Sequence, residues 1–188
     1  MLPESRNSAL GVMRKGAGEG LKSKRMVYQL VPASIEDEAW LERLRRDVYQ
    51  ELFTATFGSW DETRHARQFG ECLNRGGISI IEVDGAPVGM IQLFDQSDAV
   101  EVGEIQIQPS HQNQGIGSRV LKDTIAQVHE QRRKVLLSVA LKNDRAYQLY
   151  QRLGFQKVAH NDTHNLMACD PPSRCASSGA AAQSRGLR

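Results

Sequence analysis

The sequence predicts an α/β protein: a mixed β-sheet of about seven strands with about four helices on its two faces. Short β-rich runs alternate with longer segments whose apolar residues recur every three or four positions, the pattern of helices that pack on a sheet. One run, KVLLSVAL at 134–141, is apolar almost without interruption, as is typical of a strand covered on both faces. The length of 188 residues allows one domain of ordinary size with tails.

Apolar spacing and capping residues predict the first strand and the first two helices. Residues 26–31, MVYQLV, alternate as a strand does. Ser34 and Asp37 resemble a capping box before a helix that Gly58 ends, and Asp61 can cap a second helix. The apolar positions at helical spacing are Trp40, Leu41, Leu44, Val48 and Leu52 in the first helix, and Ala66, Phe69 and Leu73 in the second.

Three consecutive strands are expected next, at 78–83, 88–94 and 100–107. The first two flank Asp84-Gly85, and Asp-Gly between two β-rich runs is a strong signal for a hairpin.

The second half of the chain alternates helix and strand and then closes with two strands. A helix follows the loop at 112–117, and Asn143 or Asp144 caps a further helix that Gly154 ends. The apolar faces of these helices are Val120, Leu121, Thr124, Ile125 and Val128, and then Ala146, Leu149, Tyr150 and Leu153; the closing strands are FQKVAH (155–160) and THNLMA (163–168).

Composition excludes several classes of protein. The chain has 24 Lys and Arg against 22 Asp and Glu, a net charge of +2 that is too small for a dedicated nucleic-acid binder. It has no run of roughly 18 apolar residues, so we expect no membrane span. The three cysteines, Cys72, Cys169 and Cys175, form no metal-binding pattern, so we expect no metal. Their sparse, odd count fits a reducing compartment, and with no apolar secretory signal at the start we expect the cytoplasm.

Charge is distributed unevenly, and this predicts the domain boundaries. Residues 1–25 hold six basic and two acidic residues, and residues 171–188 hold three basic and no acidic ones, so 26–170 carries a net charge of −5. We expect the two ends to be disordered tails and 26–170 to be the folded domain. An acidic body favours cationic substrates by steering, although the same charge also serves solubility.

The loop at 112–117 is a candidate anion site. Backbone N–H groups at the start of a helix have no intrahelical partner and favour a phosphate, and Gly115 and Gly117 let a ligand approach closely. The loop lacks the lysine of a nucleotide-binding P-loop, and Val120 stands where a dinucleotide fold requires a third small residue. A pyrophosphate cradle and a glycine-rich helix entry without a ligand both remain open at this point.

Two motifs carry a resemblance to a known family. Gln112-Asn113-Gln114-Gly115-Ile116-Gly117 matches the pattern Gln/Arg-x-x-Gly-x-Gly/Ala. Residues 143–155 match N-x-x-A-x-x-L-Y-x-x-L-G-F. With these two motifs at this separation, the chain resembles the GNAT superfamily of acyl-CoA-dependent N-acyltransferases. The resemblance covers about 26–170, and the predicted order of strands and helices agrees with it.

The resemblance implies a binding site for acetyl-CoA as co-substrate. The loop would hold the pyrophosphate, and the strand before it would pair with the pantetheine arm where strand 134–141 splays away. Asn143 would hydrogen-bond the pantetheine, unless it serves only as a helix cap. The residues implied are Ile105, Gln106, Ile107, Gln112, Asn113, Gln114, Gly115, Ile116, Gly117, Ser118, Asn143 and Tyr150.

The resemblance also implies catalytic groups. Tyr150 would protonate the departing thiolate, the alternative being a core tyrosine, with Tyr147 as the substitute acid. Glu104 or Glu101 would act as the base, directly or through water, and Glu104 is preferred because it is nearer the thioester. The two carboxylates face opposite sides of the strand unless a bulge intervenes.

The acceptor pocket is expected between the 54–64 loop and the last strands. Trp60, Asp61 and His164 are the candidate contacts, helped by Phe57 and Glu62; the alternative is helix packing and capping. The predicted activity is direct transfer of an acetyl group to a primary amine, of a small molecule or a peptide, in a ternary complex. Transfer of another acyl group, or cofactor binding without turnover, are the alternatives. A homodimer is left open.

Overall fold

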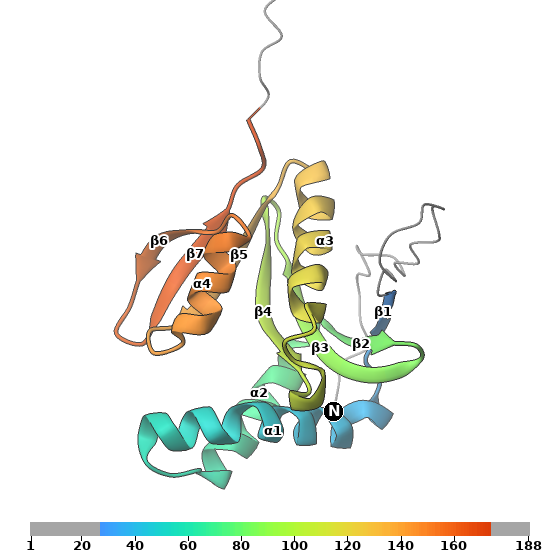
Figure 1. The fold of residues 1–188 in the computed structure, drawn as a ribbon, viewed down its shortest axis with the longest axis vertical. Coiled ribbons are helices and arrows are strands. Elements are labelled where there is room, and N and C mark those ends of the chain that lie inside the picture. Colours follow the sequence, from blue (N-terminus) through green and yellow to red (C-terminus); the bar gives the residue numbers. More distant parts are fainter. Residues whose placement is uncertain (1–26, 174–188) are drawn as a thin grey trace, which may run out of the picture.

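A computed structural model describes residues 27–173, except for the side chains of residues 51, 52 and 55–57. It confirms the fold class, because seven strands form one mixed sheet in the order β1-β2-β3-β4-β5-β7-β6 with helices packed on it (Figure 1). The elements are β1 (Tyr28–Pro32), η1 (Ile35–Asp37), α1 (Glu38–Phe57), α2 (Glu62–Arg75), β2 (Ile78–Val83), β3 (Ala86–Asp95), β4 (Ala99–Ile107), η2 (Pro109–His111), α3 (Ile116–Glu130), β5 (Lys134–Ala140), α4 (Asp144–Arg152), β6 (Gln156–His160) and β7 (His164–Cys169).

Every pair of neighbouring strands is antiparallel except β4 and β5, which are parallel. The predicted hairpin joins β2 and β3. Asp84 and Gly85 at its turn have φ of 53° and 79°, the left-handed conformation that a tight hairpin turn requires.

The beginning of the chain differs in detail from the prediction. β1 starts at Tyr28 because its antiparallel partner there, Val83, is the last residue of β2. The Ser34–Asp37 capping box is present, and the Asp37 carboxylate accepts from the Ser34 N–H at 2.7 Å. The turn that it opens is a single 3-10 turn that leads into α1. The expected tails, 1–25 and most of 171–188, and Met26 of the expected first strand lie outside the described residues.

The sheet is buried on both faces, as the β2 residues Ile80 and Ile81 show. Consecutive strand residues point to opposite faces, and both of these side chains are buried. Ile81 belongs to a core that includes Val120, Leu121 and Val128 of α3. Ile80 belongs to a second core with α1 and α2, formed by Leu41, Leu44, Cys72, Leu73, Ile78 and Met90.

β4 contains a bulge at Gly103. Gln92 of β3 pairs with Glu104, whereas its neighbour Leu93 pairs with Val102, so β4 holds one extra residue. A Cβ atom at Gly103 would lie 2.5 Å from the Phe94 ring, which explains why glycine suits the bulge.

Candidate active site

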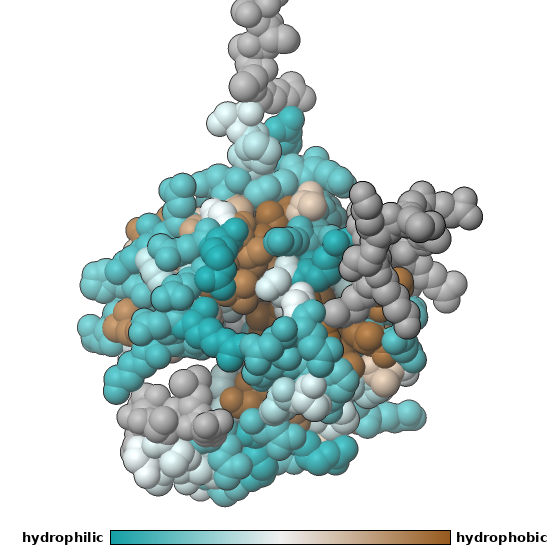
Figure 2. Space-filling view, in the orientation of Figure 1, coloured by the Kyte–Doolittle hydropathy of each residue, from teal (hydrophilic) through white to brown (hydrophobic). Residues whose placement is uncertain are grey.

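A slot opens in the sheet where β4 and β5 separate, as expected. The two strands pair only from Ala99 and Lys134 to Val102 and Leu137. In the described sheet, the edge of 103–107 that faces β5 therefore has no strand partner, and its backbone can pair with an extended ligand. Figure 2 shows an apolar strip on this face, between the polar surfaces of α3 and α4.

The loop that leads into α3 offers backbone donors at the end of this slot. Gly115 is the N-cap of α3 with φ of 80°, and a side chain there would meet no atom within 4 Å. The first helical hydrogen bond runs from the Arg119 N–H to the Gly115 carbonyl at 2.9 Å. The N–H groups of 116–118 precede it, and the first turn of α3 contains no acidic residue. This arrangement suits an anion.

Gly117 lies against the end of β4. A Cβ atom at Gly117 would lie 3.5 Å from Ile107 Cγ1 and 3.9 Å from Ile105 Cδ1, so this glycine faces β4. Such distances are ordinary van der Waals contacts, whereas a Cβ atom at Gly115 would lie in open space.

Two glutamines fix the shape of the loop. Gln112 Nε2 donates to the Ile107 carbonyl at 2.9 Å, which ties the loop to the end of β4. Gln114 Nε2 donates to the Ser110 carbonyl at 3.1 Å. The side chains thus shape the loop while its amides remain available.

The start of α4 forms the opposite side of the slot. Asn143 caps the helix, because its Oδ1 accepts from the Ala146 N–H at 3.1 Å. Arg145, which the sequence analysis missed, donates to the Asn113 side chain and so links α4 to the loop.

Tyr150 lies on the face of α4 that packs against the core. Its ring meets Phe155 edge-on with centroids 5.8 Å apart, and Tyr147 packs against the same core. Burial raises the pKa of the Tyr150 phenol, so its proton is retained at neutral pH.

Glu104 is held by an arginine that the sequence analysis also missed. Arg45 Nη1 lies 2.7 Å from each of the two carboxylate oxygens, and the Gln106 amide donates to one of them. Tyr49 is close by: the Arg45 guanidinium lies 4.9 Å from its ring centroid. Burial raises the pKa of the Tyr49 phenol and the Glu104 charge raises it further.

The bulge at Gly103 decides the orientation of Glu101. Glu104 contacts Arg45 on α1, and Glu101 contacts Arg75, the last residue of α2, at 3.4 Å. Both carboxylates therefore face the helices α1 and α2, although three residues separate them. Glu101 is the more exposed of the two.

The expected acceptor residues at 60–62 make their contacts with α1 and α2. Trp60 packs between Phe53 and His65, with centroids at 6.0 and 4.8 Å. Asp61 caps α2, and its carboxylate accepts from the Arg64 N–H at 3.0 Å. Glu62 pairs with Arg46 on α1, and the Phe57 side chain is outside the described residues. These contacts join α1 to α2 rather than either helix to the slot.

His164 lies at the start of β7. It opens β7 opposite Ala140, the last residue of β5, and its ring shares a hydrogen bond of 2.8 Å with the Thr163 hydroxyl.

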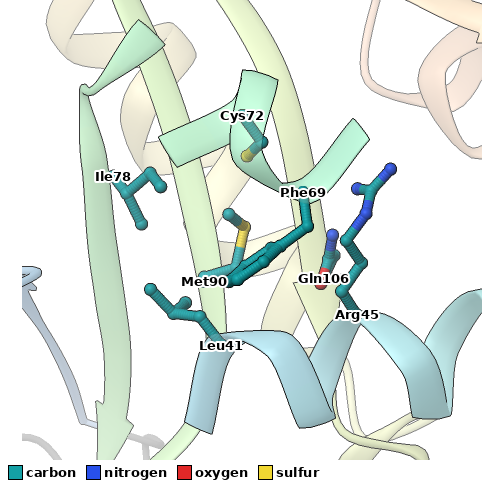
Figure 3. A pocket seen from close by; sticks show the side chains of 7 residues that line it. All are labelled: Leu41, Arg45, Phe69, Cys72, Ile78, Met90 and Gln106. Carbon is teal, nitrogen blue, oxygen red and sulfur yellow. The ribbon is translucent and has the colours of Figure 1, made fainter. Parts of the chain in front are cut away.

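A small cavity of about 10 Å³ lies between the α1–α2 pair and the sheet, and Figure 3 shows its lining. This is about the space of one water molecule. The lining residues are Leu41, Arg45, Phe69, Cys72, Ile78, Met90 and Gln106. Burial raises the pKa of the Cys72 thiol to about 11, so it is not a nucleophile at neutral pH.

The described residues, 27–173, hold no candidate metal cluster and no helix suited to crossing a membrane. In that part of the chain, no three His, Cys, Asp or Glu side chains gather in a way that could hold a metal ion. None of the described helices is long and apolar enough to cross a membrane.

Comparison with known proteins gives a family match. The model of the acetyltransferase (GNAT) family matches residues 45–155, more than half of the 188-residue chain. An uncharacterized N-acetyltransferase of Methanocaldococcus jannaschii is 25% identical over 127 residues, which cover 59% of this chain. The match spans 56% of that relative, little more than half of its length.

Solved structures share the fold. The PaiA N-acetyltransferase of Thermoplasma acidophilum, solved in complex with coenzyme A, aligns with 77% of this chain and 99% of its own, with a TM-score of 0.64 and 17% identity. The ribosomal-protein-S18-alanine N-acetyltransferase of Escherichia coli aligns with 80% of this chain and 98% of its own, with a TM-score of 0.57 and 17% identity.

Proposed function

The chain belongs to the acetyltransferase (GNAT) family, and from that membership we propose that it transfers an acetyl group from acetyl-CoA to a primary amine, directly, within a ternary complex. The observation that carries this proposal is the early separation of β4 from β5, opposite the free amides at the start of α3.

The residues around the slot fit acetyl-CoA, whose thioester supplies an activated acetyl group. The amides of 116–118 would hold the pyrophosphate in the space that Gly115 leaves open. The edge of 105–107 would pair with the pantetheine arm, and Asn143 would bind the same arm beyond its role as a cap. The coenzyme A complex of the Thermoplasma acidophilum relative supports this cofactor.

Two side chains would then move protons. Tyr150 would donate its proton to the departing thiolate, and because burial raises its pKa the phenol is protonated before the transfer. Glu104 would accept a proton from the acceptor's ammonium group, with Glu101 as the alternative. Trp60, Asp61 and His164 would shape the acceptor side.

Release of free thiol from acetyl-CoA tests the proposal across a panel of amines. The panel is spermidine, L-methionine, kanamycin and a tetrapeptide with an N-terminal alanine, the last because the Escherichia coli relative is named for an alanine acceptor. We expect acetyl-CoA to bind and at least one amine to accelerate thiol release. Binding without release would favour a cofactor-binding module, and faster release from butanoyl-CoA would favour another acyl group.

The same proposal covers the bounds of the domain, its compartment, its partners and its oligomeric state. We expect residues 26–170 to hold the whole activity, in the cytoplasm, without nucleic acid or membrane, as a monomer or a homodimer. A chain trimmed to 26–170 should keep the melting temperature and acetyl-CoA affinity of the full chain. Light scattering measures its mass and so distinguishes a monomer from a homodimer. A large loss of melting temperature would show that a tail belongs to the domain.

A further inference from the structure

Arg45 is buried on the face of α1 that packs against the sheet, with 6% of its surface exposed. It follows Leu41 by one helical turn, so the helix itself directs it inward. Its neighbours in the cavity wall are mainly apolar, among them Phe69 and Met90 (Figure 3). A guanidinium in such surroundings requires a partner.

The partner of Arg45 is Glu104, and the guanidinium is oriented toward it. Nη1 donates to both carboxylate oxygens at 2.7 Å, while Nη2 donates to the side-chain oxygen Oε1 of Gln68 at the longer distance of 3.4 Å. Nε is buried and has no hydrogen-bond partner within the described residues. The hydrogen bonds therefore satisfy the Glu104 carboxylate more completely than the Arg45 guanidinium.

Stability alone does not account for this pair. A buried ion pair is generally no more stabilising than apolar side chains that fill the same volume. The pair does, however, limit what Glu104 can do. A carboxylate has about four lone-pair sites. Arg45 takes two of them and Gln106 a third, and the Glu104 side chain remains 21% exposed.

We propose that Arg45 is a positioning residue for acetyl transfer: together with Gln106 it fixes the Glu104 carboxylate so that the remaining lone pair receives a proton from the acceptor's ammonium group. This inference rests on the proposed function. In the step, an N–H bond of the ammonium group breaks, the electron pair stays on nitrogen, and the proton passes to a Glu104 oxygen. The neutral amine can then attack.

Four variants test the role of Arg45: Arg45→Met, Arg45→Lys, Glu104→Gln and the double variant Arg45→Met/Glu104→Gln. Single-turnover rates are measured with saturating acetyl-CoA and whichever of the four panel amines the unmodified protein acetylates fastest. We expect Arg45→Met to lose at least tenfold in rate and Arg45→Lys to lose less, because it keeps a charge beside Glu104. Calorimetric affinity for acetyl-CoA should stay within twofold.

The double variant separates positioning from an independent role. If Arg45 acts through Glu104, adding Arg45→Met to Glu104→Gln should cost no more than twofold. Arg43→Met is the matched control, since Arg43 lies two residues before Arg45 on α1 and is exposed. It should stay within twofold of the unmodified rate.

Several outcomes would overturn the inference. One is a single-turnover rate of Arg45→Met or of Glu104→Gln that equals the rate of the unmodified protein. Another is the same fold-loss from Arg45→Met whether residue 104 is Glu or Gln. If Arg45→Met does not fold, the double variant decides, because it removes both buried charges; a rate tenfold below that of Glu104→Gln would contradict positioning. Inactivity of the unmodified protein with every amine would overturn the proposed function as well, so the two failures are distinguishable.

Discussion

The two sides of the candidate site are built by different means. On the side proposed for the cofactor, the donors are backbone groups: the edge of 103–107 and the amides of 116–118, with open space at Gly115. On the side of α1 and α2, side chains make the wall, and its carboxylates are paired with arginines: Glu104 with Arg45, Glu101 with Arg75, and Glu62 with Arg46.

This difference bears on what each side can recognise. Backbone amides at a helix start favour an anion whatever the neighbouring side chains are. On the opposite wall, Glu104, Glu101 and Glu62 each have an arginine partner, so this wall is less anionic than the net charge of −5 in 26–170 suggests. We therefore expect the acceptor to be recognised by shape and by one amine rather than by many positive charges, which disfavours spermidine within the panel.

The largest effect should come from the side proposed for the cofactor. Tyr150→Phe keeps the ring and its contact with Phe155 but removes the hydroxyl. General acid catalysis is worth about 10²–10⁴-fold, so the single-turnover rate should fall by that factor while acetyl-CoA affinity changes little. Single turnovers are the right measurement because slow product release would hide the loss in kcat.

Tyr147→Phe is the control for Tyr150, since it removes a hydroxyl from the same helix. Its rate should stay within about threefold of the unmodified protein. A Tyr150→Phe rate within twofold of normal would leave Tyr150 as a core residue. A loss at Tyr147 in its place would make Tyr147 the acid.

A negative charge at Gly115 should weaken acetyl-CoA binding more than a neutral side chain of the same size does. Gly115→Asp and Gly115→Asn impose the same strain at φ of 80°, but only the aspartate places a negative charge beside the helix amides. We expect Asp to bind acetyl-CoA at least tenfold more weakly than Asn, about 1.4 kcal/mol, by calorimetry. Equal affinities for the two variants would show that the pyrophosphate lies elsewhere.

The contrast also explains what could be predicted from the sequence. The order of strands and helices, the Asp84-Gly85 turn and the 112–117 loop follow from local spacing and glycine positions. The separation of β4 from β5 came with the family resemblance. A backbone site is therefore predictable, because a short motif fixes its geometry.

The opposite wall was not predictable in the same way. Arg45 and Glu104 are 59 residues apart in the chain, and only the packing of α1 on the sheet brings them together. A signal was nevertheless present, because Arg45 lies at helical spacing from Leu41, on the apolar face. The orientation of Glu101 depended on the bulge at Gly103, which no residue pattern located.

His65 provides a test confined to the wall of α1 and α2. It is 2% exposed, between the rings of Trp60 and Phe69 at 4.8 and 6.3 Å. Burial lowers its pKa, and two arginines lower it further while two glutamates oppose them. These charged groups are Arg45, Arg46, Glu42 and Glu62.

Replacing His65 by phenylalanine should reduce the loss of stability in acid. The pKa of His65 is lower in the folded chain than its ordinary value of about 6.5, so the unfolded chain binds more protons. Stability is then full above that ordinary value and falls as the pH drops toward the folded pKa. Melting temperatures at pH 7.5 and 5.5 measure this, and the drop should be smaller in His65→Phe than in the unmodified protein, because the other titrating groups contribute equally to both.

The ratio of acetyl-CoA affinities at the two pH values should be the same in both proteins, since the cofactor side contains no part of this cluster. Equal drops in melting temperature would mean that His65 is protonated as easily in the folded chain as in the unfolded one.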